Sequence, residues 1–167
     1  MNCKIEISTP NPSWKTCEEQ INSRKIAIYL KIILNRYNIF RNSQQIELSL
    51  LLTDNAEIKK LNFQFRNINK TTNVLSFPDN HISWKNINAL KTNNGYLYLG
   101  DIAFAYEYIL QESILLKKEF FEHFKHLFVH SVLHLIGYNH LQEEEADLME
   151  YLEQDMLKDF YLSKNNI

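Results

Sequence analysis

The segment EFFEHFKHLFVHSVLHLIGYNH (residues 119–140) combines an apolar run with histidines at helical spacing, and a glycine follows the run. Most other residues of 119–136 are apolar, which is typical of a helix buried on nearly all sides. At 100° per residue the histidines share a stripe about 80° wide. They are His123, His126, His130 and His134. Buried imidazoles need hydrogen-bond partners or an ion, so the segment predicts a core helix with a histidine-lined face.

The spacing of His130 and His134 indicates a metal site. Residues four apart lie on one helix face with Cβ atoms about 5–6 Å apart, so both imidazoles can reach one ion. Gly137 suits the left-handed position that ends a helix and reverses the chain, which brings His140 back over the last turn. His126 lies about 12 Å along the axis from His134 and cannot share its ion, so we expect it beside the site. The predicted ligands are therefore His130, His134 and His140.

Three neutral imidazoles suit zinc, with copper, nickel and iron as alternatives. Three protein ligands leave one coordination position open, which is typical of catalytic rather than structural zinc sites. Zinc proteases with the HExxH motif use its glutamate as general base. Here residues 131 and 132 are serine and valine. Peptide hydrolysis by that mechanism is not expected, and assisting groups must come from elsewhere in the chain.

The rest of the sequence predicts a mixed sheet packed with helices. Alternating or β-rich segments predict strands at 3–8, 45–53, 73–78 and 96–105. Helical patterns predict helices over 14–37, from Asp54 to about Phe65, and over 105–116, 119–136 and 141–160, with a polar loop at 79–95. This order predicts an α+β fold, a small mixed β-sheet of about four strands packed with about five helices.

Composition favours one soluble domain spanning residues 1–167. The chain is 45% hydrophobic and 23% charged, with a formal net charge of −2, which predicts no strongly basic surface. The apolar stretch 26–34 is interrupted by Lys31 and is too short to span a bilayer. The N-terminus has no apolar signal region. Two cysteines, Cys3 and Cys17, make no disulfide framework, so we expect a cytoplasmic protein with no membrane partner.

Several segments together resemble one known family. HSVLHLIGYNH (130–140) resembles the HGxLHLxGYDH signature of the YbeY family, bacterial endoribonucleases of ribosomal RNA maturation. FRNINKTTNVLSFP (65–78) is similar to that family's arginine loop followed by TDVLSFP, and LGDIAFA (99–105) is similar to its LGDI strand. The segment with Met149 and Glu153 resembles its last helix. The matches run from about residue 47 to 157 in the family's order.

The resemblance implies a zincin-like α+β domain with one zinc ion on the three histidines. It also implies a single-strand-specific endoribonuclease that acts in 16S rRNA 3′-end maturation and ribosome quality control. Implied partners are single-stranded rRNA, the small ribosomal subunit, a ribosome-assembly GTPase and small-subunit ribosomal proteins. Arg66 matches the family's arginine, and we expect it to face phosphate. Arg66 and His130 are the catalytic residues predicted on this basis.

Three asparagines, Asn69, Asn73 and Asn139, stand where the family has acidic residues. An asparagine accepts a hydrogen bond from an imidazole without supplying charge, so orientation of the metal ligands could be weaker. A ribosome-assembly binding factor with a mainly structural zinc and little hydrolysis is therefore an alternative function. A third is a zinc hydrolase acting on peptides or small esters. Asp101 and Asn139 are further candidates for the cleft, and Asp101 could instead end a sheet edge.

Overall fold

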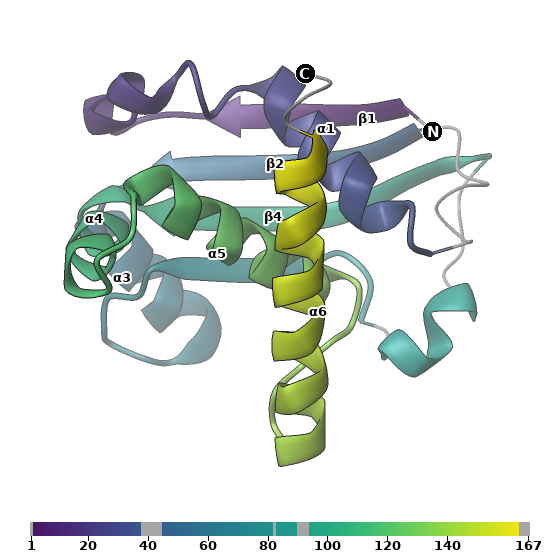
Figure 1. Cartoon of the computed structure of the whole chain (residues 1–167). Coiled ribbons are helices and arrows are strands. Elements are labelled where there is room, and N and C mark those ends of the chain that lie inside the picture. The colour runs from purple at the N-terminus through teal and green to yellow at the C-terminus, as the bar shows by residue number, and fades with distance from the viewer. Residues whose placement is uncertain (1, 38–44, 82, 90–93, 164–167) are drawn as a thin grey trace.

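The computed structural model describes residues 2–37, 45–81, 83–89 and 94–163, and it confirms the α+β fold (Figure 1). The sheet contains, in spatial order, β1 (Asn2–Ser8), β2 (Gln45–Thr53), β4 (Tyr96–Ala105) and β3 (Val74–Pro78). β1, β2 and β4 are parallel, whereas β3 runs antiparallel to β4. The prediction of a small mixed sheet is confirmed for the described residues.

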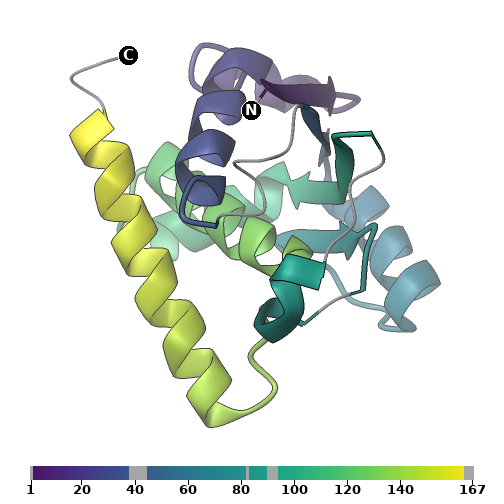
Figure 2. The ribbon, with the colours of Figure 1, turned by 90° about the vertical axis from the view of Figure 1, so that its right-hand side faces the viewer.

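Helices lie on both faces of this sheet. Figure 2 shows α1 (Ser23–Leu34), α5 (Phe120–Leu135) and α6 (Glu143–Ser163) on one side, and α3 (Asn55–Arg66) on the other. α4 (Tyr106–Leu115) follows β4 directly. In the described part of the chain, no helix has the length and apolar character needed to cross a bilayer.

The main core lies between the sheet and α5. Ile46, Leu48 and Leu50 alternate along β2 and are buried on this face. Phe124 and Phe128 of α5 are completely buried in the same cluster. The prediction that the histidine-bearing segment forms a core helix is therefore confirmed. This helix can line a cleft only where neighbouring elements do not cover it.

The helix predicted over 14–37 was wrong in its first part. Pro12–Cys17 form a short 3-10 helix, η1, and α1 begins only after Asn22. The Asn22 side chain accepts a hydrogen bond from the backbone N–H of Lys25 at 3.1 Å, which caps α1 at its N-terminus. Trp14 in η1 is buried and donates its indole N–H to a β2 carbonyl at 2.9 Å. The apolar pattern thus indicated burial correctly but assigned two elements to one helix.

The other predicted boundaries lie close to the observed ones. The Asp54 side chain accepts a hydrogen bond from the Glu57 backbone N–H at 2.8 Å, which caps α3 at its N-terminus. α3 ends at Arg66, and Asn67 after it adopts a left-handed conformation with φ 57°. The predicted loop 79–95 contains a 3-10 segment, η2 (Trp84–Ala89), and its residues 82 and 90–93 lie outside the described residues.

The sheet face opposite to α5 is called the outer face here, and α3 covers one end of it (Figure 2). Ile58 of α3 is buried there in a small apolar cluster with Leu75 of β3 and with Ala103 and Ala105 of β4. This packing fixes α3 beside β3, so the end of the helix lies next to the start of that strand. Arg66 is consequently held near the segment that precedes β3.

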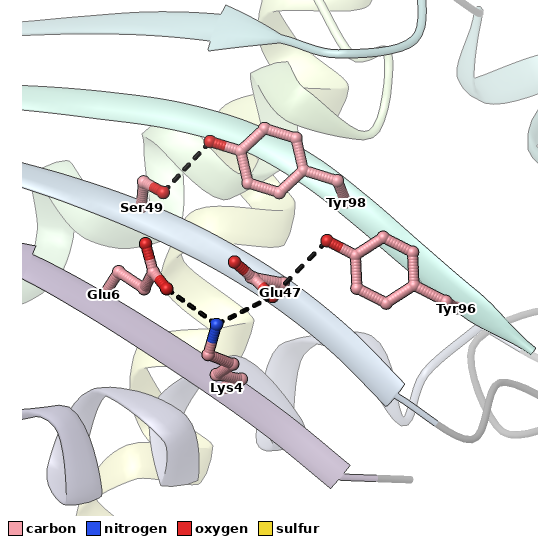
Figure 3. Close-up of polar contacts among 6 residues, drawn as sticks. All are labelled: Lys4, Glu6, Glu47, Ser49, Tyr96 and Tyr98. Carbon is pink, nitrogen blue, oxygen red and sulfur yellow. Dashed lines mark hydrogen bonds and ion pairs between the residues drawn. The ribbon is translucent and has the colours of Figure 1, made fainter.

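The other end of the outer face carries polar side chains (Figure 3). The Lys4 ammonium lies 2.6 Å from a Glu6 carboxylate oxygen and 3.3 Å from one of Glu47, which joins β1 to β2. A hydrogen bond of 3.0 Å links the hydroxyls of Tyr98 and Ser49 between β4 and β2 (Figure 3). The two faces of the sheet therefore differ in chemistry, and the histidines belong to the opposite side.

Candidate metal centre

The C-terminus of α5 has the geometry predicted from its glycine. Gly137 adopts φ 95°. The Tyr138 N–H donates to the Leu133 carbonyl at 3.0 Å, and the Gly137 N–H donates to the His134 carbonyl at 3.0 Å. These two bonds form a Schellman motif, which reverses the chain after the helix. The reversal returns His140 to the last turn of α5.

Aromatic contacts brace this turn. The Trp84 ring stacks on the Tyr138 ring with centroids 5.2 Å apart and planes 5° from parallel. The Trp84 backbone N–H donates to the Gly137 carbonyl at 3.1 Å. On the other side, the Tyr37 hydroxyl donates to the Tyr138 hydroxyl at 3.2 Å. η2 and the turn after α1 thus fix the turn that positions His140.

His130, His134 and His140 converge. Each offers one ring nitrogen, and these three atoms all lie within 4.8 Å of one another. The Nε2 atoms of His130 and His134 are 3.0 Å apart. Two nitrogens bound to one tetrahedral zinc ion at about 2.0–2.1 Å lie about 3.3 Å apart. Shifts of a few tenths of an ångström therefore suffice for His130 and His134 to bind one ion, and the His140 nitrogen lies within 4.8 Å of both.

The two helical histidines present the correct nitrogen. His130 Nδ1 lies 2.7 Å from a Glu153 carboxylate oxygen, and His134 Nδ1 lies 3.0 Å from the Tyr138 carbonyl oxygen. A neutral imidazole has a single N–H, so donating it from Nδ1 leaves the Nε2 lone pair free for a metal. Burial and the neighbouring His130 lower the pKa of His134 to about 4. His134 is therefore neutral at pH 7, as a ligand must be.

Glu153 of α6 joins the triad to His126. Its second carboxylate oxygen lies 2.7 Å from His126 Nε2. Burial raises the pKa of Glu153, but the hydrogen bonds from His126 and His130 outweigh it and lower that pKa to about 2. Glu153 is therefore an ionised acceptor shared by two imidazoles. His126 lies beside the triad, where the sequence placed it, and shares this carboxylate with His130.

Glu153 was not among the residues predicted for the site. The sequence shows only a glutamate in an acidic amphipathic helix, and many such residues face solvent. Its role depends on the packing of helices, because α6 crosses α5 (Figure 1) and this side chain is buried there to 9% exposure. The position of Glu153 within a family-like last helix was the one hint available from the sequence.

A cavity of about 470 Å³, the Arg66 cleft, opens onto the triad. It is lined by Arg66, by the start of β3, by Asn139 and by all three histidines of the triad. Arg66 is exposed, and within the described part of the chain its guanidinium has no ion-pair partner. The Asn139 side chain accepts the Leu141 N–H at 3.3 Å, which shapes the turn around His140. The structure thus brings Arg66 and Asn139 to the predicted metal site.

Asp101 is not part of this group. β4 bulges at Gly100, where φ is 133° and a Cβ atom would lie 2.1 Å from the Phe77 carbonyl oxygen. Asp101 then faces the outer side of the sheet, where the Tyr98 hydroxyl donates to its carboxylate at 2.8 Å. It lines a different cavity of about 580 Å³. β4 is a central strand, so the alternative that Asp101 ends a sheet edge was wrong.

Asn73 also has another partner than the triad. Its side-chain amide donates to Glu112 at 2.8 Å, and the same Glu112 oxygen lies 2.9 Å from His123 Nε2. Its own oxygen accepts the Val74 N–H at 2.7 Å. Asn69 is exposed in the loop before β3. Neither asparagine orients His130 or His134, because those imidazoles donate elsewhere.

Comparisons with known proteins agree with the motifs. The family model described as Endoribonuclease YbeY matches residues 12–161. An Endoribonuclease YbeY from Sinorhizobium fredii (strain NBRC 101917 / NGR234) is 35% identical over 161 residues, covering 95% of this chain and 89% of that protein. The solution structure of TM1509 from Thermotoga maritima is similar with a TM-score of 0.60 and 19% identity, covering 97% of this chain and 92% of that one. This last likeness concerns the fold alone, whereas the matched residues 12–161 include Arg66 and the triad.

Proposed function

Because this chain belongs to the YbeY endoribonuclease family, we propose that it is a zinc-dependent endoribonuclease whose active centre is the Arg66 cleft. The family match supports the endoribonuclease role. One observation carries the assignment of the site: an exposed arginine and three converging imidazoles line the same cavity. An arginine and a metal ion are the groups that stabilise charge developing on a phosphoryl group.

Each residue of the site has a defined task in this proposal. His130, His134 and His140 hold one zinc ion, which when bound supplies Lewis acidity and lowers the pKa of water. Glu153 and the Tyr138 carbonyl hold the rings of His130 and His134 so that Nε2 faces the ion. Arg66 binds the non-bridging oxygens of the scissile phosphate, since a guanidinium donates two parallel hydrogen bonds to such a group. The catalytic residues in this proposal are thus Arg66, which contacts the phosphate, and His130, which contributes as a ligand of the zinc ion.

The substrate we propose is single-stranded rRNA, with a role in 16S rRNA 3′-end maturation and ribosome quality control. The similarity of residues 65–78 and 130–140 to the family's motifs supports this assignment. The same similarity supports work on the small ribosomal subunit in the cytoplasm, together with a ribosome-assembly GTPase and small-subunit ribosomal proteins. If the assembled subunit presents the strand, this chain does not have to bind naked RNA tightly and therefore needs no strongly basic surface.

The alternative of a binding factor with a structural zinc rested on the three asparagines. The contact of Asn73 with Glu112 supports the enzyme instead, because this side chain is not the hydrogen-bond partner that orients His130 or His134. Asn139 still shapes the turn through its bond to the Leu141 N–H. The anionic partner of the metal ligands, Glu153, is present. An orienting carboxylate and a free arginine are features of a catalytic centre rather than of a structural one.

The experiment combines metal analysis with a nuclease assay on the purified full chain. We expect one zinc ion per chain and internal cleavage of a labelled single-stranded rRNA fragment, with the matching duplex left intact. His134→Ala is expected to lose both zinc and cleavage. Arg24→Ala, a change at an exposed position of α1 that does not line the cleft, is the control. Native protein without bound transition metal, or cleavage at full rate by His134→Ala, would contradict the proposal.

A further inference from the structure

The triad borders a second cavity in addition to the Arg66 cleft. This cavity, the α6 hollow, has a volume of about 430 Å³ and lies between α5 and α6. His130 and His140 line both the α6 hollow and the Arg66 cleft. The metal centre therefore stands between two spaces and is open to each.

The α6 hollow combines an apolar wall with a few polar groups. Met149 and Leu157 of α6 supply apolar surface. Gln154 and Glu150 supply an amide and a carboxylate, which are joined by a hydrogen bond of 3.3 Å. Lys118, just before α5, is the cation of the lining. Apolar side chains together with donors and acceptors in one hollow match a nucleobase, which has apolar faces and polar edges.

The charged groups of this hollow suit the edge of a base rather than a phosphate, because its lining carries the carboxylates of Glu150 and Glu153 against the single ammonium of Lys118. Glu153 lies in its lining, but its carboxylate is already engaged by His126 and His130. Glu150 is left as the carboxylate that a base can reach, and a carboxylate accepts hydrogen bonds from the exocyclic amino groups of bases. The Lys118 ammonium is a suitable partner for a backbone phosphate outside the hollow.

We propose that the α6 hollow is a nucleobase subsite, which receives a nucleotide on one side of the scissile phosphate while the Arg66 cleft receives the other side. This inference rests on the proposed endoribonuclease function. An endonuclease cuts an internal bond, so the strand must leave the metal centre in two directions and needs space in both. A volume of about 430 Å³ is within the range of about 300–1,000 Å³ typical of small-molecule sites.

The test fills the hollow with a side chain. Ala146 lies on α6 in the hollow's lining and is half-buried, so Ala146→Phe places a ring in the proposed base position. The control, Asp147→Phe, adds the same ring on the exposed side of α6. We expect Ala146→Phe to lower kcat/KM for a single-stranded oligoribonucleotide about tenfold or more, the range for loss of one base contact. Zinc content and thermal midpoint are expected to stay at wild-type values.

A substrate series identifies the side of the strand. Trimming nucleotides from one end of the oligonucleotide is expected to reduce wild-type kcat/KM by a factor similar to that of Ala146→Phe. The same trimming is expected to have little further effect on Ala146→Phe, since both changes remove one interaction. If Ala146→Phe does not fold, Gln154→Ala and Lys118→Ala, both surface changes, are expected to show the same loss of sensitivity to trimming.

The outcomes separate the two proposals. Wild-type protein that binds zinc but cleaves no RNA would overturn the proposed function and this inference with it. If the wild type cleaves RNA and Ala146→Phe is as active as the wild type, the nucleobase subsite alone is overturned. The same holds if trimming either end of the oligonucleotide affects Ala146→Phe as much as it affects the wild type. A hollow that holds only water gives that second result.

Discussion

Replacing Glu153 by glutamine is expected to weaken zinc binding about tenfold to a hundredfold, the range found when a partner of a metal-bound imidazole is removed. The carboxylate accepts hydrogen bonds from His126 Nε2–H and His130 Nδ1–H, both at 2.7 Å. A glutamine side chain has one acceptor oxygen and an NH₂ group that only donates. In Glu153→Gln, one of the two imidazoles must therefore face a donor instead of an acceptor.

The magnitude follows from the two orientations of the new amide. If its oxygen faces His130, the Nδ1–H bond persists, but it changes from a charge-assisted bond to a neutral one of about half the strength. If its NH₂ group faces His130, Nδ1 becomes the acceptor and the proton moves to Nε2, the atom required by the metal. Loss of a hydrogen bond to a charged group is worth about 1.5–3 kcal/mol. At about 1.4 kcal/mol per factor of ten, this energy corresponds to the affinity change given above.

The assay is a zinc titration in competition with a chromogenic chelator, run beside thermal unfolding of the metal-free protein. Glu144→Gln is the matched control, because it makes the same chemical change at an exposed position of α6. Zinc affinity of Glu153→Gln equal to that of the wild type would refute the orienting role. An equal loss of affinity in Glu144→Gln would show that only the net charge of α6 matters.

Three further predictions concern the same site. Arg66→Glu is expected to reduce RNA cleavage by about a hundredfold or more at unchanged zinc content, because it places an anion against the phosphate; equal activity would remove Arg66 from the mechanism. Gly137→Ala is expected to lower the free energy of unfolding in urea by about 1–2 kcal/mol, since φ 95° strains any residue with a Cβ atom; an unchanged midpoint would contradict the role given to the turn. Asn73→Asp is expected to lower the thermal midpoint at neutral pH, because it sets a second carboxylate against Glu112 at about the present 2.8 Å. Mutual repulsion raises the pKa of such a pair, so the loss is expected to shrink as acid protonates one member; a loss independent of pH would argue against this cause.

The sequence was sufficient for the centre of the fold because several local signals agree there. The apolar run of 119–136, the four-residue spacing of His130 and His134, and the glycine after them each favour one structure. That structure is a buried helix whose end folds back, and the strands of the sheet were equally clear from their alternation. Local agreement of this kind makes the triad predictable without tertiary contacts.

The break within residues 14–37 shows where such signals compete. Ile21, Ile28 and Ile32 keep helical spacing across it, which favours one long helix. Asn22 is nevertheless a good N-cap, and its side chain starts a new helix there by accepting the Lys25 N–H. The N-cap residue inside the periodic pattern was therefore the informative signal, but the periodicity led to the prediction of one long helix.

Glu153 was beyond local pattern for a different reason, since its role depends on how α6 lies against α5. That arrangement is set by buried residues of α6 such as Met156 and Phe160, which join the main core. Once they pack, the carboxylate lies beside His126 and His130. Contacts between elements over twenty residues apart are decided by the whole core rather than by any short segment.

The source of each orienting group also explains how the proposed metal centre would tolerate asparagine at positions 73 and 139. His134 donates to a backbone carbonyl, that of Tyr138, which no side-chain substitution removes. Its position depends on the turn, and the turn depends on Gly137 and on the stacking of Trp84. His130 depends on α6 instead. The orientation of the two helical ligands is therefore divided between a main-chain atom and one carboxylate, so changes at Gly137, Trp84 or Glu153 are expected to damage zinc binding more than changes at the asparagines.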